Sequence, residues 1–189
     1  MGMDEIDRKI VAMLQEDGRK SLTEIGQKLG LSHVAVRKRL AGMCERGHVR
    51  VSAGLSGERL GLQLAIVNAE VETPERLAEF VRVFSMCPRS IFVTRTTGAY
   101  NLMTIMIAED TETLRAILEA CCVRAWKGVR RSEVTVAEAP RYPEHLPIRI
   151  VAEREDSTAP CGINCGKCSR YTEGRCLACP ATKYYRGPL

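Results

Sequence analysis

Five of the nine cysteines crowd into the last 30 residues of this 189-residue chain. Their spacing is Cys-x3-Cys-x2-Cys-x7-Cys-x2-Cys, and they are Cys161, Cys165, Cys168, Cys176 and Cys179. Two Cys-x2-Cys turns aim four thiolates at one metal, because each turn presents both of its sulfur atoms to the same side. About 30 residues are too few to fold by apolar burial alone. The pattern therefore predicts a metal-stabilised module over residues 160–189, with the metal supplying folding free energy.

The cysteine spacing fits two kinds of metal centre. A zinc ribbon would use the two Cys-x2-Cys pairs and would leave Cys161 without a role. A 4Fe-4S cluster also takes four thiolates, and the Cys-x3-Cys-x2-Cys run with Cys179-Pro180 is typical of such sites. The spacing favours the iron–sulfur cluster, with zinc as the alternative. The other four cysteines, which are scattered, are predicted to be inert core thiols: Cys44, Cys87, Cys121 and Cys122.

A basic region lies near the N-terminus, far in sequence from the cysteine cluster. Residues 19–50 hold eight basic and two acidic side chains, a net charge of +6 that is typical of nucleic-acid binding. A capping-box pattern at Ser21 and Glu24 begins a short helix, Gly30 ends it, and another helix follows two residues later. This order predicts a helix-turn-helix over residues 21–46.

The second helix of this motif has an outward face that is small, apolar and cationic. Such a face fits the major groove of double-stranded DNA, where Arg and Lys meet guanine edges or phosphates. The alternative is a solvated basic face on an ordinary helical bundle, but the cap, the turn and the charge together favour DNA binding. The candidate DNA-binding residues are Ser32, His33, Val34, Arg37, Lys38 and Arg39.

The middle of the chain repeats a strand and helix pattern. Apolar runs predict strands over residues 64–71, 91–96, 102–107 and 129–137. Apolar residues at i, i+3, i+4 and i+7 predict one helix that opens at Thr73-Pro74 and another that includes Leu114 and Cys121. The order βαββαβ is ferredoxin-like, with both helices on one face of an antiparallel sheet. Apolar side chains such as Leu64 and Phe92 cannot all face the one layer of helices, so some must lie on the opposite face of the sheet. An apolar sheet face needs a partner, which predicts a homodimer.

The fold class is therefore α+β, with a winged-type helix-turn-helix, a ferredoxin-like effector domain and a small metal-stabilised module. The predicted domains are residues 1–54, 55–140 and 160–189, joined by a linker over residues 141–159. A short strand or wing is expected at His48–Ala53, before a glycine-rich hinge, and another short strand at Ile148–Val151.

The composition excludes several classes of protein. The chain is 27% charged and 45% hydrophobic, with a formal net charge of +5, which excludes a disordered or collagen-like chain. No apolar run approaches the roughly 18 residues of a membrane span. The N-terminus carries early acidic residues and no apolar core of a signal peptide, so a cytoplasmic location without membrane partners is expected.

The segment Ser21–Leu40, with Asp4–Asp7 and Ile10–Leu14 before it, resembles the Lrp/AsnC family of transcription regulators. The resemblance runs from about residue 3 to residue 139 and includes a Gly-x-Tyr-x turn at 98–101. It implies a dimer, or a higher assembly such as an octamer, that binds DNA and takes an amino acid or related small molecule near that turn. It thereby implies three candidate effector-binding residues: Gly98, Tyr100 and Asn101.

Asn101 departs from the family's usual Gly-x-Tyr-Asp. An amide cannot pair with an α-ammonium group by charge as Asp does. Gly98–Asn101 therefore has two interpretations, a loop that only closes two strands and an effector pocket.

An enzyme is the alternative function, because some proteins that resemble this family decarboxylate siroheme-type tetrapyrroles with His and Arg of the effector domain. This chain has no histidine between His48 and His145, and its candidate recognition helix keeps a basic face. We therefore expect a DNA-binding regulator rather than an enzyme, with effector, redox or metal sensing through the cysteine cluster.

Overall fold

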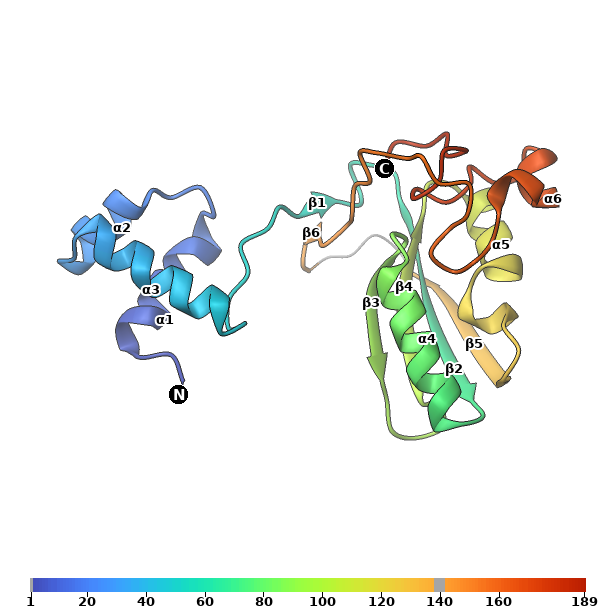
Figure 1. Ribbon diagram of the computed structural model, residues 1–189, viewed down its shortest axis with the longest axis horizontal. Coiled ribbons are helices and arrows are strands. Elements are labelled where there is room, and N and C mark those ends of the chain that lie inside the picture. The colour runs from blue at the N-terminus through green and yellow to red at the C-terminus, as the bar shows by residue number, and fades with distance from the viewer. Residues whose placement is uncertain (1, 138–141) are drawn as a thin grey trace. The chain divides into compact units, whose positions relative to one another are not determined.

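The computed structural model describes residues 2–137 and 142–189, which form two compact units that divide after Ala53 (Figure 1). The first unit contains three helices, α1 (Glu5–Glu16), α2 (Leu22–Leu29) and α3 (His33–Glu45). Capping boxes begin α1 at Asp4 and α2 at Ser21. The second confirms the capping pattern predicted at Ser21 and Glu24. The fully buried core of the unit consists of Ile10, Ile25, Val36 and Met43.

The turn between α2 and α3 depends on two glycines. Gly30 ends α2 in the left-handed region, at φ 67°, which glycine adopts without steric cost. Gly26 lies where the chain crosses itself, since a Cβ there would lie 2.6 Å from the Leu31 carbonyl oxygen. The backbone N–H of Leu31 donates to the Gly26 carbonyl at 2.9 Å. The two glycines therefore fix the angle at which α3 leaves the turn.

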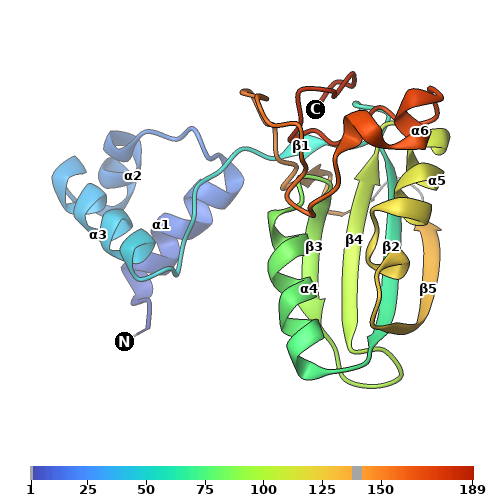
Figure 2. The same cartoon turned by 45° about the vertical axis from the view of Figure 1, so that its right-hand side comes forward.

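The second unit is built on a four-stranded antiparallel sheet in the order β3-β4-β2-β5 (Figure 2). Its elements follow the predicted βαββαβ order: β2 (Gln63–Val71), α4 (Pro74–Met86), β3 (Ser90–Arg95), β4 (Leu102–Ala108), α5 (Thr111–Ala120) and β5 (Val129–Ala137). A 3-10 turn at Val123–Ala125 precedes β5. In the core between the helices and the sheet, the ring centroid of Trp126 lies 5.4 Å from that of Phe80 and 5.3 Å from that of Phe84. The ferredoxin-like α+β prediction is confirmed.

The described residues cover one end of the outer face of the sheet, the face away from the helices. There Leu64 and Ile107 pack against Leu146, Ile148 and other residues of the C-terminal segment. Phe92, Ile105 and Ile66 are aligned across three strands by their register. Ile105 packs against the edge of this cover, whereas Phe92 is 46% exposed. An apolar row of this kind is a typical contact surface for another protein chain.

Both predicted short strands are wrong. Residues 48–53 form no strand, and neither do residues 148–151. Instead, β1 (Leu55–Ser56) pairs with β6 (His145–Leu146). A strand needs a partner for its backbone hydrogen bonds, and the tertiary fold brings β1 and β6 together rather than the predicted segments. Ile148 contributes its side chain to the apolar cover of the sheet.

The cysteine-rich segment belongs to the same compact unit as the sheet. It contains a 3-10 turn at Cys165–Lys167 and a short helix, α6 (Ser169–Thr172). The predicted boundary between residues 140 and 141 falls outside the described residues. No helix of the described ranges has both the length and the apolar character that a membrane span requires.

Candidate nucleic-acid interface and cysteine-lined cavity

The outward face of α3 carries the candidate DNA-binding residues. The Ser32 hydroxyl accepts from the Ala35 backbone N–H at 3.2 Å and caps the helix. His33, Val34, Arg37 and Lys38 are exposed on the same helix whose Val36 and Met43 are fully buried. Val34, although apolar, is 58% exposed on the same face.

Arg39 has a partner within its own unit. Its Nη1 lies 2.6 Å from the Asp4 Oδ2 and 2.9 Å from the Asp7 Oδ1, so the guanidinium ties α3 to the start of α1. The Asp7 backbone N–H and the Arg39 guanidinium lower the pKa of Asp4, and hydrogen bonds to both carboxylates raise the pKa of Arg39. Arg39 therefore positions the helix, an intradomain role that the sequence prediction did not contain.

The turn at residues 98–101 is closed by the side chain of Asn101. Its Oδ1 accepts from the Val71 N–H, and its Nδ2 donates to the Val71 carbonyl, both at 2.8 Å. The guanidinium of Arg131 lies 5.2 Å from the centroid of the Tyr100 ring and donates to the Ala99 carbonyl. Gly98 adopts a φ of 124°, in the region that favours glycine. These contacts support the loop-closing interpretation for Asn101.

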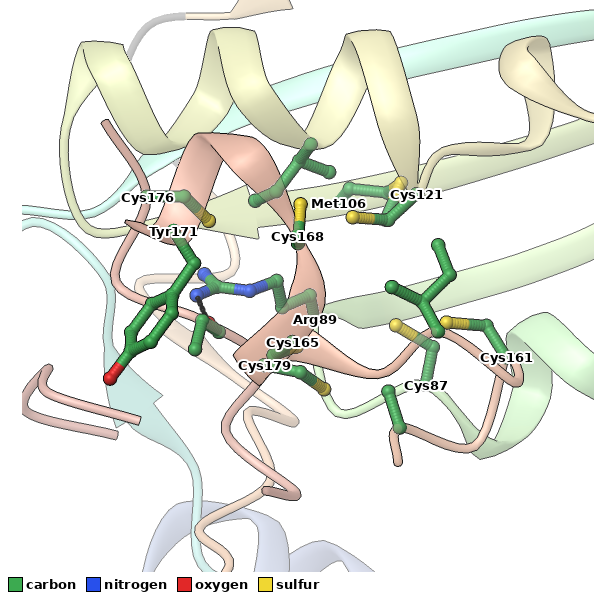
Figure 3. Close-up of a pocket in the computed structure, with 14 residues that line it drawn as sticks. Cys87, Arg89, Met106, Cys121, Cys161, Cys165, Cys168, Tyr171, Cys176 and Cys179 are labelled. Atoms are coloured by element: carbon green, nitrogen blue, oxygen red, sulfur yellow. Dashed lines mark hydrogen bonds between the residues drawn. The ribbon is translucent and has the colours of Figure 1, made fainter. Parts of the chain in front are cut away.

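The cysteine-rich tail, residues 160–189, contributes all five of its cysteines to one cavity in the second unit. Two cysteines of the ferredoxin-like domain line the same cavity (Figure 3). The cavity lies among the end of α4, the start of β3, helix α5 and the tail. Its volume is about 40 Å³. The seven cysteines are Cys87, Cys121, Cys161, Cys165, Cys168, Cys176 and Cys179. Within the described ranges, no three His, Cys, Asp or Glu side chains are grouped closely enough to hold a single metal ion.

The tail is held on the domain by a buried ion pair beside this cavity. Arg89 and Glu109 pair through side chains that are each only 4% exposed. Arg89 Nη2 also donates to the Ala178 carbonyl at 2.6 Å, and the Tyr185 hydroxyl donates to Glu109. Burial opposes the charge of Arg89, but Glu109 outweighs it, so the pKa of Arg89 is raised. The pair thus connects the sheet to the turn between Cys176 and Cys179.

That turn is strained. Ala178 has a φ of 67°, the left-handed region in which an alanine costs about 1–2 kcal/mol. Such conformations persist when surrounding contacts enforce them, and here Arg89 binds the carbonyl of the strained residue. In the other Cys-x2-Cys turn, the Tyr184 ring packs against Gly166 and leaves no room for a Cβ. Both Cys-x2-Cys turns are therefore contacted by side chains from outside the turn.

The cavity thiols are poorly solvated. Burial raises the pKa of Cys161 and Cys176, raises that of Cys179 to about 12, and raises that of Cys121 further. Metal binding would release these protons, because thiolates are the ligands.

Reasoning from the sequence missed Cys87, Cys121 and Arg89 at this site. The prediction of inert core thiols describes Cys122, which is buried in the main core, but Cys44 is exposed. The one available signal was that Cys87 and Cys121 each follow an apolar helix directly. Nothing in the spacing indicated that a segment 40 or more residues later returns to them.

The chain is similar to known transcription regulators. A family model of the AsnC-type helix-turn-helix domain matches residues 3–43. The transcriptional regulator LrpA of Pyrococcus horikoshii is 32% identical over 120 residues, which cover 61% of this chain and 83% of LrpA. The regulator Ptr1 of Methanocaldococcus jannaschii is 30% identical over 117 residues, covering 61% of this chain and 79% of Ptr1.

A solved structure agrees with these relatives. That of B. subtilis LrpC matches with a TM-score of 0.59 and 26% identity, over 72% of this chain and 95% of LrpC. The two sequence matches leave more than a third of this chain unmatched. Because they span most of each relative at 30% identity or more, this chain belongs to the Lrp/AsnC family of helix-turn-helix transcription regulators.

Proposed function

We propose that this regulator binds its operator through the outward face of α3 and that the cysteine-lined cavity senses metal or redox state. The observation that carries the first part is the exposure of Arg37 and Lys38 beside Val34, on a helix whose opposite side is buried. Neither Arg37 nor Lys38 forms an ion pair within the described part of the chain. Both charges are available to phosphates or guanine edges, with Ser32 and His33 at the start of the same helix.

Titration of DNA binding against salt tests this assignment. The probe is a fragment selected by the protein from a random-sequence library. Arg37→Ala and Lys38→Ala should weaken binding, and each lost phosphate contact should reduce the salt slope by about 1. The matched control is Arg115→Ala, because Arg115 is an exposed arginine on α5 paired with Glu112. Unchanged affinity and slope in folded Arg37 and Lys38 variants would show that α3 is not the recognition helix.

The functional unit is a homodimer formed through the outer face of the sheet. The aligned row of Ile66, Ile105 and Phe92 supports this surface, because the row extends from Ile105, at the edge of the apolar cover, to the exposed ring of Phe92. Sedimentation velocity at micromolar concentration distinguishes monomer, dimer and higher assemblies such as an octamer.

We place sensing in the cavity rather than at the turn of residues 98–101. The amide of Asn101 is already bonded at both ends to Val71, which leaves the turn poorly suited to an amino-acid effector. The relatives reported above are named transcription regulators and do not support the decarboxylase alternative. The cavity gathers seven thiols, and we favour an iron–sulfur cluster over zinc as its occupant because a zinc ribbon leaves Cys161 without a role.

Purification without oxygen tests the cofactor. An iron–sulfur centre gives brown protein with bound iron and sulfide, whereas a zinc site gives colourless protein with one zinc per chain. Cys168→Ser should lose either centre, and Cys161→Ser should lose only the cluster. Operator binding should change when the centre is removed, and metal-free protein as isolated would refute this function of the cavity.

A further inference from the structure

Two cysteines of the ferredoxin-like domain face the same cavity as the five tail cysteines. Cys87 directly follows α4, and Cys121 directly follows α5. Their neighbour in sequence, Cys122, is fully buried in the main core and does not line the cavity. The cavity wall therefore includes two specific thiols of the domain, which a metal site confined to the tail would not require.

The positions of these two thiols are fixed by backbone contacts. The Cys121 N–H donates to the Ile117 carbonyl at 2.9 Å, which holds the residue on the last turn of α5. Arg149, from the C-terminal segment, donates to the Cys87 carbonyl at 2.6 Å and to the Ser85 carbonyl at 2.9 Å. Arg149, which precedes the cysteine-rich tail in the chain, thus fixes the end of α4 where Cys87 faces the cavity. Preorganised ligands of this kind favour metal binding.

The number of cysteines in the cavity exceeds what one metal centre needs. A zinc ion and a 4Fe-4S cluster each take four thiolates. The tail supplies five cysteines and the domain adds two, and all seven line one space of about 40 Å³. The domain thiols are therefore candidates for the same four positions as the tail thiols.

We infer that the cavity is an iron–sulfur cluster site shared between the tail and the ferredoxin-like domain, with at least one of Cys87 and Cys121 as a ligand. This inference rests on the proposed metal-binding function of the cavity and specifies its ligands. It also gives the site a route to the rest of the regulator. Cys87 lies three residues before β3, whose Phe92 belongs to the exposed apolar row, so the cluster braces the strand that carries the proposed dimer contact.

Iron content and visible absorption of full-length variants purified without oxygen test this inference. The variants are Cys87→Ala, Cys121→Ala and the double replacement. Cys122→Ala is the control for loss of a buried thiol, and Cys44→Ala is the control for loss of an exposed one. The double variant should lose the cluster, whereas both controls should keep it. A double variant with the full iron content and spectrum of the wild type overturns the inference and leaves the tail metal centre intact.

A measurement on the wild-type chain does not depend on how the variants fold. Thiol alkylation, mapped by mass spectrometry, is compared before and after a chelator strips the iron. Cys87 and Cys121 should become reactive together with the tail cysteines, while Cys44 reacts equally in both states. If stripping exposes only the tail thiols, the domain cysteines are not ligands. Wild-type protein that holds zinc and no iron overturns this inference alone, whereas protein without either metal overturns the proposed metal function itself, so the two failures are distinguishable.

Discussion

Replacing Arg89 by methionine removes one partner of the buried ion pair that connects the tail to the sheet. Both side chains of the pair are 4% exposed, so solvent cannot replace the lost guanidinium. Glu109 would keep only the Tyr185 hydroxyl, and the carbonyl of Ala178 would lose its donor. Breaking a buried pair from one side costs about 3–5 kcal/mol. For a unit of this size that loss lowers the Tm by roughly 10–15 °C.

Chemical unfolding of the metal-free full chain measures this cost, and limited proteolysis reports whether the tail detaches first. The control is the double variant Arg89→Met with Glu109→Gln, which removes the buried charge but keeps an acceptor for Tyr185. It should recover most of the lost stability, because an unpaired buried charge causes most of the penalty. If Arg89→Met costs less than about 1 kcal/mol, or if the double variant recovers nothing, the pair does not hold the tail.

Three further replacements test other parts of the structure. Gly26→Ala should cost about 1–3 kcal/mol in thermal unfolding, because its Cβ would lie 2.6 Å from a backbone oxygen that cannot move independently; an unchanged Tm would contradict this. Phe92→Asp should convert the dimer to monomer in sedimentation velocity, whereas Ile150→Asp, at another exposed apolar residue, should not. Asn101→Ala should cost about 1–3 kcal/mol in urea unfolding by leaving both Val71 backbone groups without their partner; a neutral effect would reopen an effector role for Asn101.

Local patterns predicted the elements of this fold well. Ser21, Gly30 and Thr73 cap or end helices where their residue types indicated, since a capping contact spans only a few residues. The predicted last strand coincides with β5, and the other strand limits differ by only one residue. The predicted strands over residues 48–53 and 148–151 failed because pairing depends on a partner distant in the chain.

The sequence by itself determined the helix-turn-helix, the βαββαβ order and the outward cationic face of α3, because helical and strand periodicities are local properties. Only the tertiary structure decided how individual side chains are used. It pairs Arg39 with α1, bonds Asn101 to Val71 and buries Arg89 against Glu109. It also brings the tail back to two domain cysteines to form the cavity. These contacts join residues 20 or more positions apart, and closing such distances requires the whole fold.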